Sequence, residues 1–384
     1  MFNPLQKIEP TDVTFGWVEE NLNGKDQRWD NLRLSYGIFN SEARTISGSG
    51  FLSYIIRIVF SFNDTEEKFS VILKVPTSDI IQDLLGKPKQ DGGVNEHMTK
   101  SHNREILFYQ QIAIKCDVVY FPKMYGYVEC SEGNASYGRI LVEDVGDRGV
   151  LPDVLTGLNF AQCAEVLRVL ARFHAFSLLN LDDEVLEKIR DRPPNEHHPE
   201  GPPYMPICEL DPFFKENEEL LRTVMRHPPG FDSAKTFGVK EFITHGDFWA
   251  NNLFFERNGN GEAGEKVFTI FDWQMLRPGT GLSDVARFLA VSTTEEVLEK
   301  DVEQLLKVYY SAMQEELSSK GVSMPYDYEK MKQLFRHEFP AEFSFATMIL
   351  PMLLQQAPDE TKKNAVIRRL KLAFNFTKEC LNIK

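Results

Sequence analysis

The N-terminal part of the chain alternates between β-type runs and helical patterns. Residues 47–60 and 68–76 are rich in β-branched and aromatic side chains and flank a polar segment at 63–67. Such a pair of runs around a short polar turn predicts a β-hairpin. The other elements that the pattern predicts here are helices at 11–22 and 103–116 and strands at 123–130 and 138–145. Residues 1–145 are therefore expected to form an α+β region.

Helical periodicity dominates the rest of the chain. It is clearest at residues 160–179 and 365–381, where apolar side chains recur every three to four positions. Residues 191–212 are rich in proline and suit a long surface excursion, which we interpret as an insertion rather than a domain boundary. The pattern predicts a mostly α-helical second region over residues 146–384.

Composition and charge narrow the class of protein. A chain of 384 residues with 42% hydrophobic positions and 29 phenylalanines can bury a large core, which favours two domains or one large two-lobed domain. The 57 acidic side chains exceed the 43 lysines and arginines, giving a formal net charge of −14. This charge repels phosphate backbones and anionic membranes, so nucleic acid and membranes are not expected as partners.

Cysteine usage and the apolar segments bear on location. The five cysteines are scattered without the CxxC spacing of a zinc or redox site, which is typical of a reducing compartment. The first residues show no basic segment followed by an apolar one, and the apolar stretch from Phe345 to Leu354 is too short to span a membrane. The sequence predicts a cytoplasmic protein.

The segment from His245 to Asn252 (HGDFWANN) carries the most chemistry, together with Asp272 in Phe271-Asp272-Trp273. Short apolar runs on either side of a Gly- and Asn-rich turn predict a hairpin that brings Asp272 back beside Asn252. A carboxylate and an amide oxygen form a typical partial shell for Mg²⁺. Asp247 is then free to orient an acceptor hydroxyl and take its proton. Alternatively, these residues are ordinary turn and cap residues.

The pattern HGDxxxxN, followed by a strand that ends in FDWQ, resembles the aminoglycoside and choline kinase superfamily. Within it, the chain is similar to CHK kinase-like proteins, close to the ecdysteroid kinase-like family and its nematode members. The resemblance implies a protein-kinase-like two-lobed α+β fold, with an antiparallel sheet and helix in the N-lobe and a helical C-lobe. It also implies ATP with Mg²⁺ as cofactors and phosphorylation of a small-molecule hydroxyl. By this match Asp247, Asn252 and Asp272 are catalytic, and the last two hold the metal.

The same resemblance requires a lysine on the third strand, and Lys74 in VILKVP meets this requirement. Such a lysine contacts the α and β phosphates and needs an acidic partner on a helix. Glu105 is our first choice and Glu96 the second. The alternative is that Lys74 is an edge-strand residue with its ammonium in solvent and that Glu105 lies on a solvated helix face.

Two further segments are expected to contact the nucleotide. Gly48, Ser49, Gly50 and Ser53 precede a strand, where backbone amides could cover phosphates, although Ser53 stands where a third glycine is usual. A plain flexible turn is the alternative. The resemblance also places the hinge strand at residues 140–147, where backbone groups from Glu143 to Val145 would contact adenine.

Residues in two helices are expected to have supporting roles. Ser283 or Asp284 suits the N-cap of a helix, although the resemblance implies that Asp284 braces the catalytic loop. His174 is expected to be a buried structural residue.

Three readings of the function remain at this stage. The favoured one is a small-molecule kinase whose acceptor is sterol-like, a xenobiotic glucoside or an amino alcohol. A pseudokinase that only binds is the alternative, and a protein kinase is less favoured. No Ala-Pro-Glu segment follows Asp272, and Gly246 replaces the arginine that pairs with a phosphorylated activation loop.

Overall fold

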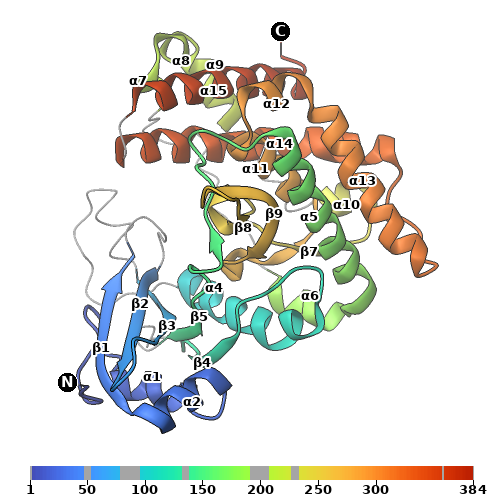
Figure 1. The fold of residues 1–384 in the computed structure, drawn as a ribbon. Helices are drawn as coiled ribbons and strands as arrows, with labels where there is room; N and C mark the ends of the chain where they lie inside the picture. Colours follow the sequence, from blue (N-terminus) through green and yellow to red (C-terminus); the bar gives the residue numbers. More distant parts are fainter. Residues whose placement is uncertain are drawn as a thin grey trace. The chain divides into compact units, whose positions relative to one another are not determined.

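The computed structural model describes residues 2–46, 53–77, 96–131, 138–190, 207–225, 233–356 and 359–383. Two units can be distinguished along the chain (Figure 1). Unit 1 comprises Met1–Lys115 and Phe121–Arg148, and unit 2 comprises Cys116–Tyr120 and Gly149–Lys384. In the part of the chain that these ranges cover, no helix combines the length and apolar character needed to cross a bilayer.

Unit 1 is built on a five-stranded sheet in the order β1-β2-β3-β5-β4, in which every neighbouring pair is antiparallel. Its elements are α1 (Phe15–Leu22), α2 (Gln27–Tyr36), β1 (Ile38–Thr45), β2 (Ser53–Phe62), β3 (Lys68–Pro76), α4 (Glu96–Leu107), β4 (Met124–Val128) and β5 (Arg139–Glu143). The expected hairpin is confirmed, because β2 pairs with β3 from Ser53 opposite Pro76 to Ser61 opposite Lys68.

The core of unit 1 centres on Trp29 of α2, which packs edge-on against three phenylalanines of β2 and β3. The sequence pattern did not predict α2 or β1. Helix α2 buries only Trp29 and Leu32, and β1 is an edge strand whose side chains are largely exposed, so neither shows a strong apolar period. Helix α1 begins at Phe15 instead of residue 11 because the Thr14 hydroxyl accepts a hydrogen bond from the Trp17 amide and caps it.

The helix expected at residues 103–116 is wrong in its bounds. Helix α4 starts earlier, at Glu96, and the chain from Phe108 to Ile112 continues as a short π-helix before a short 3₁₀ helix. The apolar spacing of this segment reflects all three pieces, which differ in residues per turn and so share no single helical period.

Unit 2 is largely helical. Its elements are β6 (Gly149–Val150), α5 (Phe160–Asn180), α6 (Asp183–Ile189), α7 (Ile207–Leu210), α8 (Pro212–Glu216), α9 (Glu218–Met225), α10 (Ser233–Phe237), β7 (Phe242–Thr244), β8 (Leu253–Arg257), β9 (Ala263–Ile270), β10 (Arg277–Gly279), α11 (Leu282–Ser292), α12 (Glu295–Lys300), α13 (Val302–Ser319), α14 (Tyr328–Gln356) and α15 (Glu360–Cys380).

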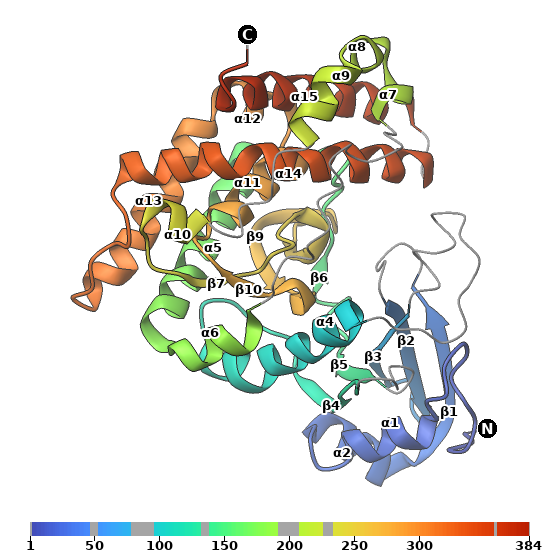
Figure 2. The same ribbon diagram turned by 180° about the vertical axis from the view of Figure 1, so that it is seen from behind.

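Unit 2 contains the two helices that the sequence pattern predicts most clearly, α5 and α15. Asn159 and Gln162 form a capping box at the start of α5, and Asp359 caps α15. Helices α14 and α15 lie side by side in both views (Figure 2). Helix α11, whose side chains are nearly all buried, packs against α14.

Two small antiparallel sheets carry the polar loops of unit 2. Strand β7 pairs with β10, and β8 lies between β6 and β9. The β8–β9 hairpin places Leu253 opposite Ile270. The ends of this hairpin therefore bring residue 252 and residue 271 together.

Candidate active site

The segment from His245 to Asn252 forms a loop between β7 and β8 whose backbone is fixed at its first turn. Gly246 has a φ of +79°, and a Cβ on it would lie 2.1 Å from the carbonyl oxygen of Met275. Only glycine fits this conformation and this close approach. The glycine before Asp247 therefore follows from the geometry of the loop.

His245 is completely buried and joins the loop to the strand that precedes Asp272. Its Nε2 donates to the Phe271 carbonyl at 2.9 Å, and its Nδ1 accepts from the Asp247 amide at 3.2 Å. A carbonyl can only accept and an amide can only donate, so the two contacts select the tautomer with the hydrogen on Nε2. The Trp273 ring packs on the imidazole, with ring centroids 4.5 Å apart.

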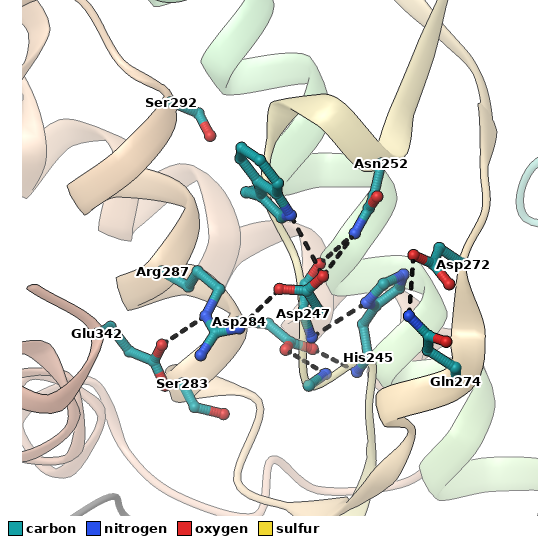
Figure 3. A network of polar contacts seen from close by, with 12 residues as sticks. His245, Asp247, Asn252, Asp272, Gln274, Ser283, Asp284, Arg287, Ser292 and Glu342 are labelled. Carbon is teal, nitrogen blue, oxygen red and sulfur yellow. Dashed lines mark hydrogen bonds and ion pairs between the residues drawn. The ribbon is translucent and has the colours of Figure 1, made fainter. Parts of the chain in front are cut away.

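The carboxylate of Asp247 is held by donors on both oxygens (Figure 3). Its Oδ2 accepts from Asn252 Nδ2 at 3.0 Å and from Trp249 Nε1 at 3.3 Å. Its Oδ1 accepts from Arg287 Nη1 at 2.7 Å. The carboxylate is therefore oriented from three directions, as a group that positions a hydroxyl must be.

Sequence reasoning missed Arg287, Glu342 and Trp249. Arg287 lies on α11 and also donates from Nε to Glu342 Oε2 of α14 at 2.6 Å. Burial alone would lower the pKa of Arg287, but the two carboxylates outweigh this and hold the pKa above its ordinary value. A tryptophan two residues after the aspartate was the one visible signal, whereas the other two residues lie 40 and 95 positions away from Asp247.

Helix α11 braces the loop at two more points. Both oxygens of Asp284 accept backbone hydrogens of the loop, from His245 at 2.7 Å and from Gly246 at 2.9 Å, and Ser292 Oγ accepts from the Ala250 amide at 2.9 Å. The alternative of an N-cap role for Ser283 or Asp284 is wrong, because the cap position is Gly281 and both residues lie inside the helix.

His174 of α5 completes this support. Its Nε2 donates to Asp284 at 3.2 Å, and its Nδ1 accepts from the Tyr309 hydroxyl at 2.8 Å, with no exposed surface on the ring. Burial acts to raise the pKa of Asp284, yet the hydrogen bonds from His174 and from the Gly246 amide act in the opposite direction, and the pKa stays below its ordinary value. Asp284 is thus held as a carboxylate that can accept from the loop amides.

Asn252 and Asp272 flank the open end of the β8–β9 hairpin, where the Phe271 amide donates to the Asn252 carbonyl at 3.1 Å. Asp272 has a φ of +64°, a left-handed conformation that is uncommon outside glycine and is enriched at functional positions. Its Oδ2 accepts a hydrogen bond from the side-chain nitrogen Nε2 of Gln274 at 3.3 Å.

The donor set of Asn252 and Asp272 fits Mg²⁺. The side-chain nitrogen of Asn252 hydrogen-bonds to Asp247, so the side-chain oxygen Oδ1 is the atom that could bind a metal ion. Asp272 contributes carboxylate oxygens. Within the described ranges, no three His, Cys, Asp or Glu side chains gather as an all-protein metal site. Mg²⁺ sites usually have one or two protein oxygens as ligands, and water and phosphate oxygens complete the coordination shell.

In unit 1, Lys74 of β3 and Glu105 of α4 form a buried ion pair. Lys74 Nζ lies 2.5 Å from Glu105 Oε2, and the side chains are 10% and 4% exposed. The structure therefore brings together the two residues that the sequence paired. The alternative reading of Lys74 and Glu105 as solvated surface residues is wrong, since burial and pairing exclude it.

The remaining residues expected to contact nucleotide are less completely described. Gly48, Ser49 and Gly50 lie outside the described residues, while Ser53 is buried at the start of β2. The Glu143 amide at the end of β5 donates to the Lys123 carbonyl at 2.9 Å, and the Val145 carbonyl accepts from the Arg148 amide at 3.0 Å.

The fold and the site together define a class. An antiparallel sheet with a strand lysine paired to a helix glutamate is followed by a helical region. That region holds a loop with Asp247 and Asn252 and then Asp272 after a hairpin. This combination is the protein-kinase-like fold, so the fold class predicted from the sequence is confirmed.

Comparison with protein families agrees with this class. Residues 47–237 match the model of the ecdysteroid kinase-like family, so the resemblance inferred from the sequence motifs is confirmed. Residues 214–374 match a second family model, described as uncharacterized oxidoreductase dhs-27.

Two relatives come from Caenorhabditis elegans. The uncharacterized oxidoreductase dhs-27 is 25% identical over 372 residues, which cover 90% of this chain and 43% of the relative. The uncharacterized kinase-like protein D1044.1 is 22% identical over 281 residues, covering 70% of each chain. The chain thus spans less than half the length of the first relative.

Among solved structures, an ethanolamine kinase of Plasmodium vivax is 14% identical, with a TM-score of 0.40. The match covers 91% of this chain and 89% of that one.

Proposed function

We propose that this protein is a phosphotransferase that moves the γ-phosphoryl group of ATP to a hydroxyl of a small molecule. The observation that carries the proposal is the Asp247 carboxylate, oriented by Arg287, Asn252 and Trp249 beside the Asn252–Asp272 oxygen pair. A fixed carboxylate next to a magnesium-type donor set is the arrangement that phosphoryl transfer requires.

The residues divide the work. Asp247 orients the acceptor hydroxyl and receives its proton as the oxygen–phosphorus bond forms and ADP leaves. Lys74, placed by Glu105, binds the α and β phosphates. Asn252 and Asp272 would hold Mg²⁺, which supplies neutralisation of the phosphate charge. The ecdysteroid kinase-like match and the kinase-like relative support this assignment.

The acceptor is proposed to be a small molecule and not a nucleic acid or a membrane lipid surface. The net charge of −14 disfavours polyanions. Sterol-like alcohols, xenobiotic glucosides and amino alcohols are the acceptors to screen. The cysteines are all free thiols, which suits the reducing cytoplasm as the place of the reaction.

An oxidoreductase activity is not proposed, although one relative and one family model carry that word. Every strand ladder among the described residues is antiparallel. Dinucleotide-binding oxidoreductase domains of the Rossmann type are built on a mostly parallel sheet. The relative extends well beyond the matched segment, so its name describes a longer protein.

A pseudokinase that binds a ligand without transferring phosphate is the second candidate. It predicts that some site residues have lost their contacts, whereas Lys74, Asp247 and Asn252 all make the interactions described above.

The first test is thermal unfolding with and without Mg-ATP, because it needs no acceptor. At about 100 times Kd, a ligand should add about 2.7 kcal/mol to the stability of the native state. The rise in midpoint should require magnesium and should be lost in Asp272→Ala. Asp64→Ala is the matched control, because Asp64 also has a left-handed backbone, with φ of 53°. No rise in the wild-type protein would contradict ATP as the donor and favour a pseudokinase.

A further inference from the structure

The guanidinium of Arg287 forms ion pairs with two carboxylates, those of Asp247 and Glu342. Its Nη1 lies 2.7 Å from Asp247 Oδ1 and its Nε lies 2.6 Å from Glu342 Oε2. The planar guanidinium can hold both partners in fixed directions at once, which a lysine ammonium cannot do. The side chains of Arg287, Asp247 and Glu342 are 18%, 19% and 6% exposed, so water screens the cluster only weakly.

The guanidinium of Arg287 is also held by an aromatic ring. Its guanidinium carbon lies 4.2 Å from the centre of the Phe345 ring, and the same ring packs edge-on against Trp249 with centroids 5.8 Å apart. Phe345 and Glu342 are one turn apart on α14, while Arg287 is on α11. The position of the Arg287 head is therefore set by the packing of α11 against α14.

The hydrogen-bond capacity of Asp247 shows where a substrate can bind. A carboxylate offers about four lone-pair sites. Asn252 and Trp249 use both sites on Oδ2, and Arg287 uses one site on Oδ1. The remaining site is on Oδ1, the oxygen that Arg287 holds.

We propose that Arg287 is a positioning residue for phosphoryl transfer, because it fixes Oδ1 of Asp247, the oxygen that accepts the hydrogen of the acceptor hydroxyl. Glu342 in turn fixes Arg287. This inference rests on the proposed function. It assigns to α14 an indirect role in orienting the acceptor, through Glu342 and Arg287. Loss of Arg287 leaves Oδ1 free to rotate away from the hydroxyl while the residues that bind nucleotide keep their contacts.

The test measures ADP release from Mg-ATP with water as acceptor in the full chain. Arg287→Met, which keeps an unbranched side chain but removes the guanidinium, should lower kcat by about 10²-fold, the loss that a displaced reacting group causes. Its KM for ATP should stay unchanged, and Arg287→Lys should restore part of kcat. Glu342→Gln should lower kcat less, again without a change in KM.

Arg190 provides a matched control, since its guanidinium also joins two carboxylates, Glu187 at 2.9 Å and Glu241 at 2.8 Å. Arg190→Met and Glu241→Gln should leave kcat unchanged. Folding of each variant is checked by the rise in unfolding midpoint with Mg-ATP.

The outcomes separate the two proposals. Wild-type turnover with an Arg287→Met kcat equal to that of Arg190→Met overturns the role of Arg287 alone. A change in KM without a change in kcat also overturns it, because Arg287 would then serve nucleotide binding. A wild-type rate no higher than that of Asp247→Asn overturns the proposed function, and the inference with it.

Discussion

At the scale of single residues, each unit contains charged side chains that are at least partly buried together with partners of opposite charge. Examples are Lys74 with Glu105 in unit 1 and Arg287 with Asp247 and Glu342 in unit 2. A buried charge whose partner is removed is strongly destabilising, whereas removal of both partners is often tolerated. Stability and function can therefore be separated by single and double substitutions.

Lys74 offers the clearest separation. Lys74→Met should raise the KM for ATP about 10- to 100-fold, as expected for loss of a hydrogen bond to a charged phosphate. It should also lower the free energy of unfolding by ~3–5 kcal/mol, because the buried Glu105 carboxylate loses its lysine partner. The double variant Lys74→Met/Glu105→Gln should regain much of the stability but keep the raised KM. Steady-state kinetics and urea unfolding measure the two effects. A double variant with a normal KM would contradict the role of Lys74.

At the scale of elements, helix α11 holds the loop that carries Asp247, and α15 holds the end of α11. Asp284, Arg287 and Ser292 of α11 each contact the loop. Arg369 of α15 is 1% exposed and donates to the carbonyl of Val291, near the C-terminal end of α11. It also donates to the carbonyls of Val154 and Leu155 at 2.9 and 3.0 Å.

Arg369 and its neighbour Arg368 make a matched pair for testing this. Arg369→Ala should lower the free energy of unfolding by ~2–5 kcal/mol, because three buried carbonyls lose their donor and a cavity opens. Arg368 is 55% exposed and pairs with Glu295, so Arg368→Ala should change the free energy of unfolding by no more than ~1 kcal/mol. Chemical denaturation of both variants measures the difference. Equal effects would show that α15 does not depend on the buried guanidinium.

At the scale of the whole molecule, the excess of acidic side chains extends into the interior of unit 2. Glu338 of α14 is 1% exposed, and its Oε2 has no hydrogen-bond partner among the residues that the structure describes. Burial raises the pKa of Glu338 to about 7, from an ordinary value of 4.5, and the charges of Glu342 and Asp284 act in the same direction. Ser233 and Arg277 oppose the shift without cancelling it.

This carboxyl makes global stability depend on pH. Between about pH 4.5 and 7 the native state keeps a proton that the unfolded chain releases, so stability should fall as the pH rises through this window. Glu338→Gln has no such proton, and its stability relative to wild type should improve by ~2–4 kcal/mol across the window. Urea unfolding at pH 5 and pH 8 tests this. Parallel stability curves for the two proteins would contradict a raised pKa.

Elements with a strong local period could be predicted, and those without one could not. Apolar, β-branched and aromatic runs marked the strands β2, β3, β8 and β9. Apolar residues at every three to four positions marked the helices α5 and α15. Edge strand β1 and helix α2 bury few side chains and leave little pattern. The N-cap reading of Asp284 failed because its carboxylate is used by backbone amides 38 and 39 residues away.

The sequence by itself predicted an α+β region followed by a helical region, its motifs resembled a kinase superfamily whose fold the structure confirms, and it supplied the candidate site residues within short motifs. Asp247 and Asn252 share one loop, Asp272 follows the hairpin from that loop, and Lys74 stands in a strand run that is unmistakably β-forming. These features are encoded locally, by side-chain type and spacing.

Only the tertiary structure decided which side chains hold Asp247 in place. Arg287 lies 40 residues from Asp247, and Glu342 lies 55 residues further along. Each looks, in sequence, like an ordinary charge on an amphipathic helix. They become part of the site because α11 and α14 pack together and bury both charges, and a buried charge must find a partner of opposite sign.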